Sequence, residues 1–421
     1  MPTKIKIILN ENKQKIRRIK MKKVFQTQIY LNILIAIIIL INYHTVKDWI
    51  YFGILVVAVL VNKNKKISQL INTVLIPMIF IEQVSYLSDI LIQHFSKMTL
   101  LIFGIYAVGT IMVLIPVTIV EYGKIKKPIW RLIASVWMIN VIIMYCYPLT
   151  LKNVNPDGFL MSLNKSGLVY ALAILVYVYF AVKSWGYEFC FNLPTFKGKK
   201  LQLLSSILIF GIAIWISLFK VFIGFAQRWQ ELFWNWDFSL LDPTESALLK
   251  NAWSVFLYSI EAGIGEEATR YINLVLLLVI FKNKKWQING AVLGSAILFA
   301  LPHIGNAFNS ELKQTPIATV FQVIDTFGFG CFAAALILYS GKLWPTMIIH
   351  TLCDILVFSE TPLTQDDVGI FGGNTGSLIY VIISLVLWVS FAVFILIKNR
   401  KLIKQNAKIL TKVQKTDLTI S

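Results

Sequence analysis

The sequence has few charged residues and little cysteine for its length. Charged side chains make up 14% of the 421 residues, whereas hydrophobic ones make up 57%. Soluble proteins carry about 25% charged residues, so this composition excludes an ordinary soluble domain and indicates a polytopic membrane protein. No CxxC spacing joins the four cysteines, Cys146, Cys190, Cys331 and Cys353. They therefore indicate neither a disulfide framework nor a zinc site.

Long apolar runs fill most of the chain. About twelve of them are long enough, or nearly so, to cross ~30 Å of hydrocarbon at ~1.5 Å per residue. The sequence therefore predicts an all-α membrane helix bundle with about 12 transmembrane helices. The expected spans are 24–44, 48–62, 67–92, 98–121, 132–150, 166–182, 201–225, 251–281, 287–308, 316–340, 343–360 and 375–397.

Acidic residues are scarce beside basic ones, with 21 Asp and Glu against 40 Lys and Arg. A net charge of +19 can indicate nucleic-acid binding, but here most basic residues fall in loops on one side of the predicted spans. This is the positive-inside pattern of membrane proteins. We therefore expect a multi-pass protein of the cell membrane with both termini cytoplasmic, membrane lipids as partners and no nucleic acid.

The predicted spans divide the chain into three parts. Residues 1–250 hold seven hydrophobic spans whose function the sequence does not indicate, and they end in a Trp-rich segment, 227–250. That segment is expected at the outer surface, as an aromatic belt or as a substrate gate. Residues 251–397 form the predicted functional core, and residues 398–421 form a basic cytoplasmic tail. Scattered polar residues of the first part have ordinary interfacial explanations, among them Glu82, Asp89, Glu121 and Lys220.

Ionisable side chains are concentrated in four consecutive spans between residues 251 and 360. An ionised group at the bilayer centre costs at least ~2.5 kcal/mol, so such residues face the bundle interior and are functional candidates. The set comprises Glu261, Glu266, Glu267, Arg270, His303, Asp325, His350 and Asp354.

The spacing of these residues suggests catalytic chemistry. Arg270 follows Glu266 by four residues and Glu267 by three, so on a helix either glutamate can pair with the guanidinium. The other glutamate then stays free to act as a general base. Two further spans each place functional groups one turn apart: Phe299 with His303, where Pro302 is expected to open the helix, and His350 with Asp354.

The three motifs "EEATR", "FALPH" and "HTLCD" resemble those of the CPBP intramembrane proteases, also called the Abi or CAAX-protease family. The second and third fit as Phe-x-x-x-His and His-x-x-x-Asp. The first departs, because the family usually has three residues between the second Glu and the Arg, and this sequence has only Ala268 and Thr269. The motifs lie within the C-terminal half of the chain.

The resemblance implies peptide hydrolysis inside the membrane on a membrane-associated peptide or protein, with bacteriocin immunity and peptide maturation as known roles of bacterial members. The implied catalytic residues are Glu266, Glu267, Arg270, His303, His350 and Asp354. A glutamate takes a proton from water that His303 helps to hold, and His350 with Asp354 stabilises the oxyanion. We favour Glu266 as the base and Glu267 with Arg270 as its supporting ion pair, although the spacing allows the reverse.

Three questions remain open at this point. A metal enzyme needs three ligands and an open position, which His303, His350 and a glutamate can supply, but no HExxH helix is present, so no cofactor is predicted and zinc remains an alternative. A proton- or ion-coupled transporter could use Glu261, Glu266, Arg270 and Asp325, but no internal repeat supports it. The third alternative is a catalytically inactive immunity or scaffold protein.

Overall fold

The computed structural model describes residues 2–61, 64–191, 200–223, 226–249, 251–308, 315–361 and 373–413. Within these ranges the regular secondary structure is helical, and the one β-type interaction is an isolated bridge between Leu241 and Glu360. The prediction of an all-α fold is therefore confirmed. Of the predicted cytoplasmic tail, residues 414–421 lie outside the described residues.

Seven of the described helical segments are long and apolar enough to cross a membrane. An eighth span results if α7 (Phe159–Lys165) and α8 (Leu168–Ser184), which meet at a bend of 52°, are counted together. Two shorter apolar segments occur, Ile207–Phe222 within α9 (Lys200–Phe222) and α14 (Trp344–Phe358). The chain is thus a multi-pass membrane protein, while the total of twelve spans and the orientation of the termini stay predictions.

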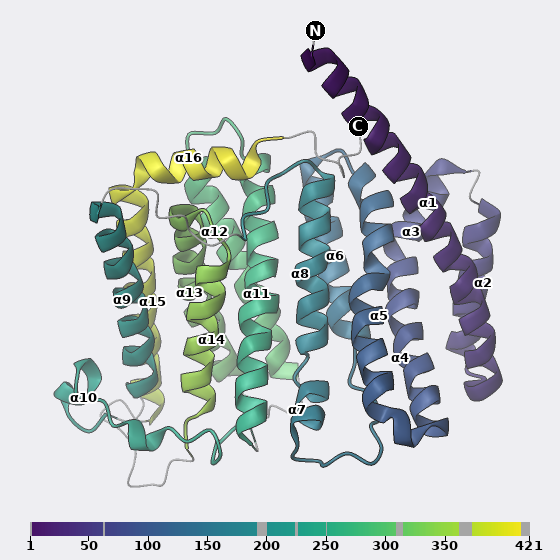
Figure 1. Cartoon of the computed structure of the whole chain (residues 1–421). Coiled ribbons are helices and arrows are strands. Elements are labelled where there is room, and N and C mark those ends of the chain that lie inside the picture. The colour runs from purple at the N-terminus through teal and green to yellow at the C-terminus, as the bar shows by residue number, and fades with distance from the viewer. Residues whose placement is uncertain are drawn as a thin grey trace. The chain divides into compact units, whose positions relative to one another are not determined.

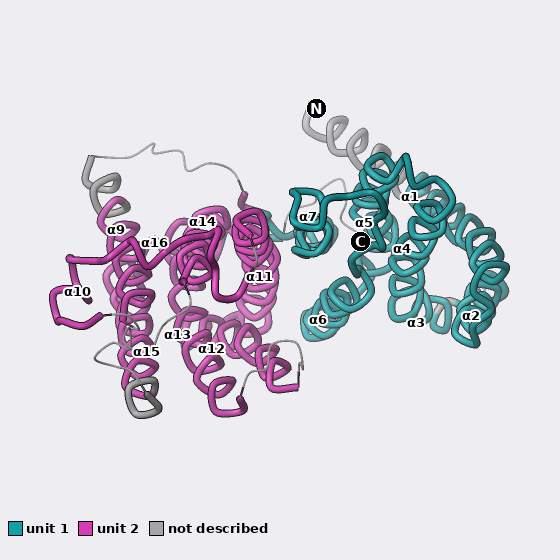
Figure 2. Tube along the Cα trace, turned by 90° about the horizontal axis from the view of Figure 1, so that it is seen from below, with its two compact units in different colours: residues 1–189, 412–421 teal, residues 190–411 magenta. Residues whose placement is uncertain are grey.

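The chain divides into two compact units (Figure 2). Unit 1 comprises Met1–Phe189 with Lys412–Ser421, and unit 2 comprises Cys190–Thr411. In unit 1, α5 packs against α4 and α8, and α1 packs against α2, α4 and α5. Besides α7 and α8, its helices are α1 (Pro2–Tyr43), α2 (Val46–Leu60), α3 (Lys65–Val74), α4 (Ile76–His94), α5 (Thr99–Val120) and α6 (Pro128–Tyr145).

Unit 2 is built around two long helices (Figure 1). The first, α11, packs against α12 and α14, and the second, α13, packs against α12 and α15. Helix α9 also belongs to this unit and packs against α14, although the sequence grouped it with residues 1–250. The remaining bounds are α10 (Trp229–Phe233), α11 (Ala252–Ile280), α12 (Gln287–Ala300), η5 (Leu301–Phe308), α13 (Pro316–Ser340), α15 (Gly373–Lys398) and α16 (Arg400–Thr411).

A glycine allows α11 and α14 to approach closely. A Cβ atom at Gly263 would lie 2.1 Å from Thr351 Oγ1 and 2.8 Å from the carbonyl oxygen of Met347, both on α14. Only a residue without a side chain fits there, and such small residues let membrane helices pack backbone to backbone. This contact brings the glutamates of α11, one turn further along, next to the histidine of α14.

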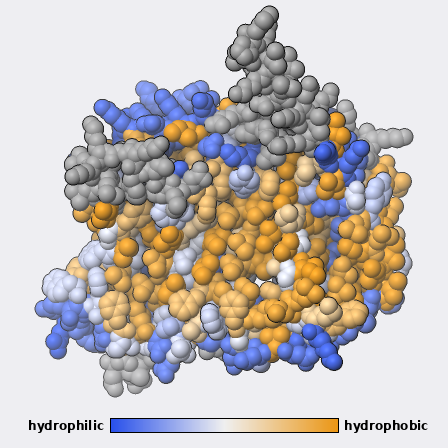
Figure 3. All heavy atoms as spheres, viewed as in Figure 1, coloured by the Kyte–Doolittle hydropathy of each residue, from blue (hydrophilic) through white to orange (hydrophobic). Residues whose placement is uncertain are grey.

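The surface hydropathy agrees with a membrane environment. On the face that Figure 3 shows, hydrophobic residues cover the middle of the helices, and hydrophilic residues gather toward the helix ends. Large apolar side chains are exposed, for example Leu34 at 60% and Ile105 at 62%. Apolar surface on this scale is stable only against another apolar medium, here the hydrocarbon of the bilayer.

Candidate active site

A cavity of about 640 Å³ opens within unit 2. Four of the six residues predicted to be catalytic line it: Glu266 from α11, His303 from η5, and His350 and Asp354 from α14. The other two, Glu267 and Arg270, do not line the cavity and are completely buried. The structure therefore brings together three segments that are separated in sequence.

Arg270 and Glu267 form a buried ion pair on α11, in which Nη1 donates to Glu267 Oε1. The guanidinium carbon lies 3.6 Å from the centre of the Phe299 ring and 5.3 Å from that of Phe329. A charge removed from water needs a partner of opposite sign, and an aromatic face adds cation–π attraction. Of the two pairings that the spacing allowed, the structure has the one between Arg270 and Glu267.

His350 is held by the same carboxylate. Its Nδ1 lies 2.8 Å from Glu267 Oε1. Because an ionised carboxylate only accepts hydrogen bonds, Nδ1 carries a proton and donates it. The ring also packs against Phe329, with the ring centres 4.9 Å apart. Glu267 thus sets the orientation of the imidazole and directs Nε2 toward the remaining carboxylates.

Two carboxylates face His350 Nε2. Glu266 Oε2 lies 3.7 Å away and Asp354 Oδ2 lies 3.6 Å away. Both separations are longer than a hydrogen bond, so neither carboxylate is bonded directly to Nε2. The Glu266 side chain is 34% exposed, whereas that of Glu267 is 0% exposed. Of the adjacent glutamates, Glu266 is therefore the one that a water molecule in the cavity can reach.

His303 lies directly after the end of α12, where the chain continues as the 3₁₀ helix η5. The change of helix type falls at Leu301, directly before Pro302, where the sequence predicted that the helix opens. The His303 ring meets Phe299 edge-on, with the ring centres 5.6 Å apart. Its Nε2 is buried and has no hydrogen-bond partner among the described residues.

The sequence did not single out one residue of the cavity wall. Lys220 on α9 lines the cavity and forms an ion pair with Asp325 on α13. The second carboxylate oxygen of Asp325 accepts a hydrogen bond from Ser384 Oγ at 2.5 Å. The sequence had treated Lys220 as an interfacial residue. The available signal was one cation and one anion in two otherwise apolar spans, which require each other's charge.

The Trp-rich segment is part of unit 2 and packs near the cavity. Trp236 stacks on Phe222 of α9, with the ring centres 6.2 Å apart. Beyond it, the amide of Asp242 donates to the Ser359 carbonyl at 2.8 Å, just after the end of α14. The next residue, Glu360, lines the cavity, and burial raises the pKa of its carboxyl to about 7. Whether this segment acts as a belt or as a gate stays a prediction.

Zinc stays an alternative to metal-free catalysis at this site. Among the described residues, no group of three or more His, Cys, Asp or Glu side chains has an arrangement that can hold a metal ion. No step of the chemistry below is therefore assigned to a metal.

Comparison with known proteins identifies one relationship. Residues 248–356 match the family model for the type II CAAX prenyl endopeptidase Rce1-like proteins. The match covers roughly a quarter of the chain and includes all six predicted catalytic residues, but neither Lys220 nor α15. Neither the curated proteins nor the solved structures contained a match to this chain.

Proposed function

Residues 248–356 belong to the CPBP, or CAAX protease, family, and we propose that the chain is an intramembrane endopeptidase that cleaves a membrane-associated peptide or protein. The observation that carries this proposal is the convergence of Glu266, His303, His350 and Asp354 on one cavity inside the helix bundle. Catalytic groups in a site shielded from bulk water act on each other more strongly than at a surface.

The first step is activation of water by Glu266. A water in the cavity donates one proton to the Glu266 carboxylate, while His303, which lines the same cavity, holds it in place. The resulting hydroxide forms a bond to the scissile carbonyl carbon, and the carbonyl oxygen becomes an oxyanion. Glu267 serves in this scheme as the fixed partner of Arg270 and His350 rather than as the base.

The second step is stabilisation and collapse of the oxyanion. To donate from Nε2, His350 must carry a second proton, taken up from solvent before the reaction, and Glu267 on one side and Asp354 on the other balance the resulting imidazolium charge. A preorganised donor of this kind contributes about 2.7–4 kcal/mol to transition-state stabilisation. When the oxyanion collapses, the C–N bond breaks and the leaving nitrogen takes the proton that Glu266 holds. Atoms and charge balance without a metal.

The substrate class follows from the setting of the cavity. The site lies within a bundle of apolar helices, and aromatic rings such as Phe299, Phe329 and Trp388 line its wall. These surfaces favour an apolar or membrane-associated peptide over a soluble one. Bacteriocin immunity and peptide maturation are the biological roles proposed on the basis of the family resemblance.

The test uses cells that carry the wild-type chain, Glu266→Gln or the matched control Glu245→Gln, whose side chain is exposed outside the cavity. Quantitative proteomics of their membranes is expected to find a peptide or protein that is cut in wild-type and control cells and remains intact with Glu266→Gln. Cleavage by the purified chain is expected to survive dialysis against a chelator. Equal cleavage patterns in all three strains contradict the proposal.

A further inference from the structure

The last described helix of unit 2 differs from the spans in its composition and direction. Helix α16 begins two residues after α15 ends and lies across the ends of α11 and α13 (Figure 1). Because Leu378–Lys398 of α15 is apolar and long enough to span the bilayer, α16 starts where that span leaves the hydrocarbon. The helix is therefore at the level of the lipid headgroups.

One face of α16 is fixed to the bundle. Ile403, Ala407 and Leu410 are buried, and their spacing of four and three residues places them on a single face. Asn406 donates from Nδ2 to the carbonyl oxygens of Leu338 and Tyr339, at 2.8 and 2.9 Å. These carbonyls lie in the last turn of α13 and have no partner within that helix. The docking is thus specific, and it orients the other faces of α16.

The outward faces of α16 carry positive charge on one side and an exposed isoleucine on the other. Arg400, Lys404 and Lys408 recur every four residues, with Lys401 beside them, and all four side chains are exposed. The flank beyond Lys401 exposes Ile409, at 42%. Figure 3 shows hydrophilic residues gathered at this level of the molecule. A helix that offers a cationic stripe beside an apolar flank fits the boundary between anionic headgroups and acyl chains.

We propose that α16 is a binding site for anionic phospholipids of the bilayer, in which Arg400, Lys401, Lys404 and Lys408 contact the headgroups and Ile409 contacts the acyl chains. A lipid surface is the occupant, rather than a free phosphate, because only a lipid satisfies the charged and the apolar side together. Bound lipid then holds α16 against the ends of α11 and α13, the helices that carry Glu267, Arg270 and Asp325.

The test uses the full-length chain with Cys190→Ser and Gln405→Cys, and a fluorophore is attached to the new cysteine next to the basic stripe. The labelled protein is reconstituted in vesicles of phosphatidylcholine. Nitroxide-labelled phosphatidylglycerol is expected to quench the fluorophore at a far lower mole fraction than nitroxide-labelled phosphatidylcholine. Each basic residue at a membrane surface contributes about a fivefold preference. Replacing Lys401, Lys404 and Lys408 by Gln is therefore expected to reduce the selectivity for phosphatidylglycerol on the order of 100-fold.

Two matched variants make the result specific. Replacing the same three lysines by Arg is expected to keep the selectivity, since charge is retained. Replacing three exposed lysines of unit 1, Lys97, Lys152 and Lys165, by Gln removes equal charge elsewhere and is expected to keep it as well. The proposal is overturned if the Gln variant of α16 keeps the wild-type selectivity for phosphatidylglycerol, or if the unit 1 variant loses as much of that selectivity. It is also overturned if added inorganic phosphate abolishes the preference for phosphatidylglycerol.

Discussion

Both units bury charged residues among apolar helices, but these residues face different surroundings. In unit 1, Glu82 is 3% exposed. Its carboxylate forms an ion pair with Lys47 Nζ at 2.5 Å and accepts a hydrogen bond from the Tyr51 hydroxyl at 2.6 Å. In unit 2, Glu266 faces a cavity of about 640 Å³ together with two histidines. Burial of a carboxylate in a membrane helix therefore does not by itself indicate catalysis, and access to open space distinguishes the two cases.

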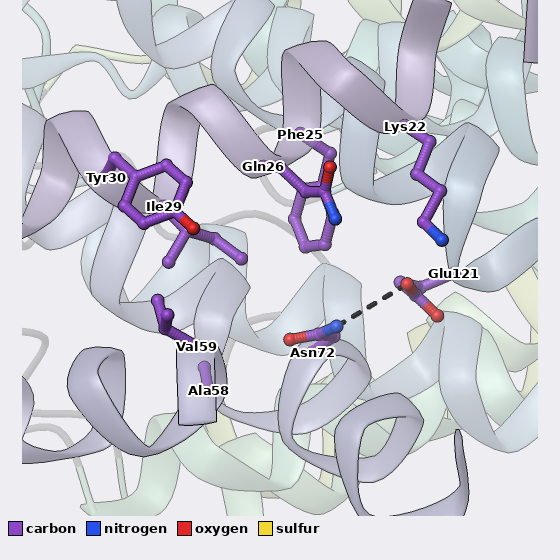
Figure 4. Close-up of a pocket in the computed structure, with 9 residues that line it drawn as sticks. All are labelled: Lys22, Phe25, Gln26, Ile29, Tyr30, Ala58, Val59, Asn72 and Glu121. Carbon is purple, nitrogen blue, oxygen red and sulfur yellow. Dashed lines mark hydrogen bonds between the residues drawn. The ribbon is translucent and has the colours of Figure 1, made fainter. Parts of the chain in front are cut away.

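A small pocket of unit 1 sharpens the contrast. It measures about 30 Å³, which is room for about one water molecule. Figure 4 shows Glu121 at its edge with Asn72, whose Nδ2 lies 3.5 Å from the carboxylate. Glu121 also pairs with Lys124 at 2.8 Å. A site already neutralised and too small for a peptide has a structural role, whereas the cavity of unit 2 can take a substrate.

The largest expected effect is loss of cleavage in Glu266→Gln. Removing a general base typically lowers the rate by roughly 10²–10³ or more, and the amide keeps the shape of the side chain, so normal protein levels are expected. The counterpart in unit 1, Glu82→Gln, is expected to leave the rate per folded molecule unchanged. Cleavage assays normalised to folded protein check both. Full activity of Glu266→Gln would reverse the comparison between the units.

The two histidines are expected to separate catalysis from stability. His303→Ala and His350→Ala should each reduce the rate by roughly 10²–10³, because one positions water and the other stabilises the oxyanion. Only His350→Ala should also lower the folded fraction, since it removes the hydrogen bond to the buried Glu267. Rates and thermal unfolding measured on both variants provide the check. Full activity of both histidine variants would contradict the proposal that the chain is a protease.

Glu267→Gln is expected to act mainly on stability. It leaves Arg270 charged and completely buried without a partner, and breaking such a pair costs about 3–5 kcal/mol. We expect little folded protein to accumulate. Fluorescence size-exclusion chromatography measures that amount. If Glu267→Gln instead accumulates normally but is inactive, and Glu266→Gln accumulates poorly, the roles of the two glutamates are exchanged.

Two lysine ion pairs offer a matched comparison of smaller size. Lys220→Met leaves Asp325 buried in the cavity wall, and an unsatisfied buried polar group costs about 1–3 kcal/mol or more. Lys47→Met is expected to cost at most about 1 kcal/mol, because Lys47 is 44% exposed and its interaction with Glu82 is screened by solvent. Unfolding midpoints of the two variants in the same detergent are the measurement. Equal shifts would mean that the cavity pair has no special role.

The smallest expected effect is a pH dependence from Glu360. Burial raises the pKa of this carboxyl from its ordinary value of 4.5 to about 7, so the folded state binds a proton that the unfolded state has released. The stability that results is fully present below pH 4.5 and is lost as the pH rises through about 7. Glu360→Gln is expected to make the unfolding midpoint less dependent on pH between 4.5 and about 7. An unchanged profile would contradict it.

The helical fold and the set of ionisable residues could be predicted from sequence because both depend on local chemistry. Uncharged runs of about 20 residues have one stable form in a bilayer, and a buried charge stands out against such a run. The number of spans stays a prediction. The sequence assigned spans to residues 251–281 and 343–360, but the charges of α11 and the short length of α14 keep both helices out of the seven that are long and apolar enough to cross a membrane.

The sequence alone determined which residues could react, since the motifs around Glu266, His303 and His350 are contiguous in the chain. Only the tertiary structure decided how they are used: that Arg270 pairs with Glu267, that Glu266 is left facing the cavity, and that Lys220 joins the wall from α9. The physical reason is that helical spacing restricts a side chain to a few neighbours, whereas the choice among them depends on which face of each helix is packed against another.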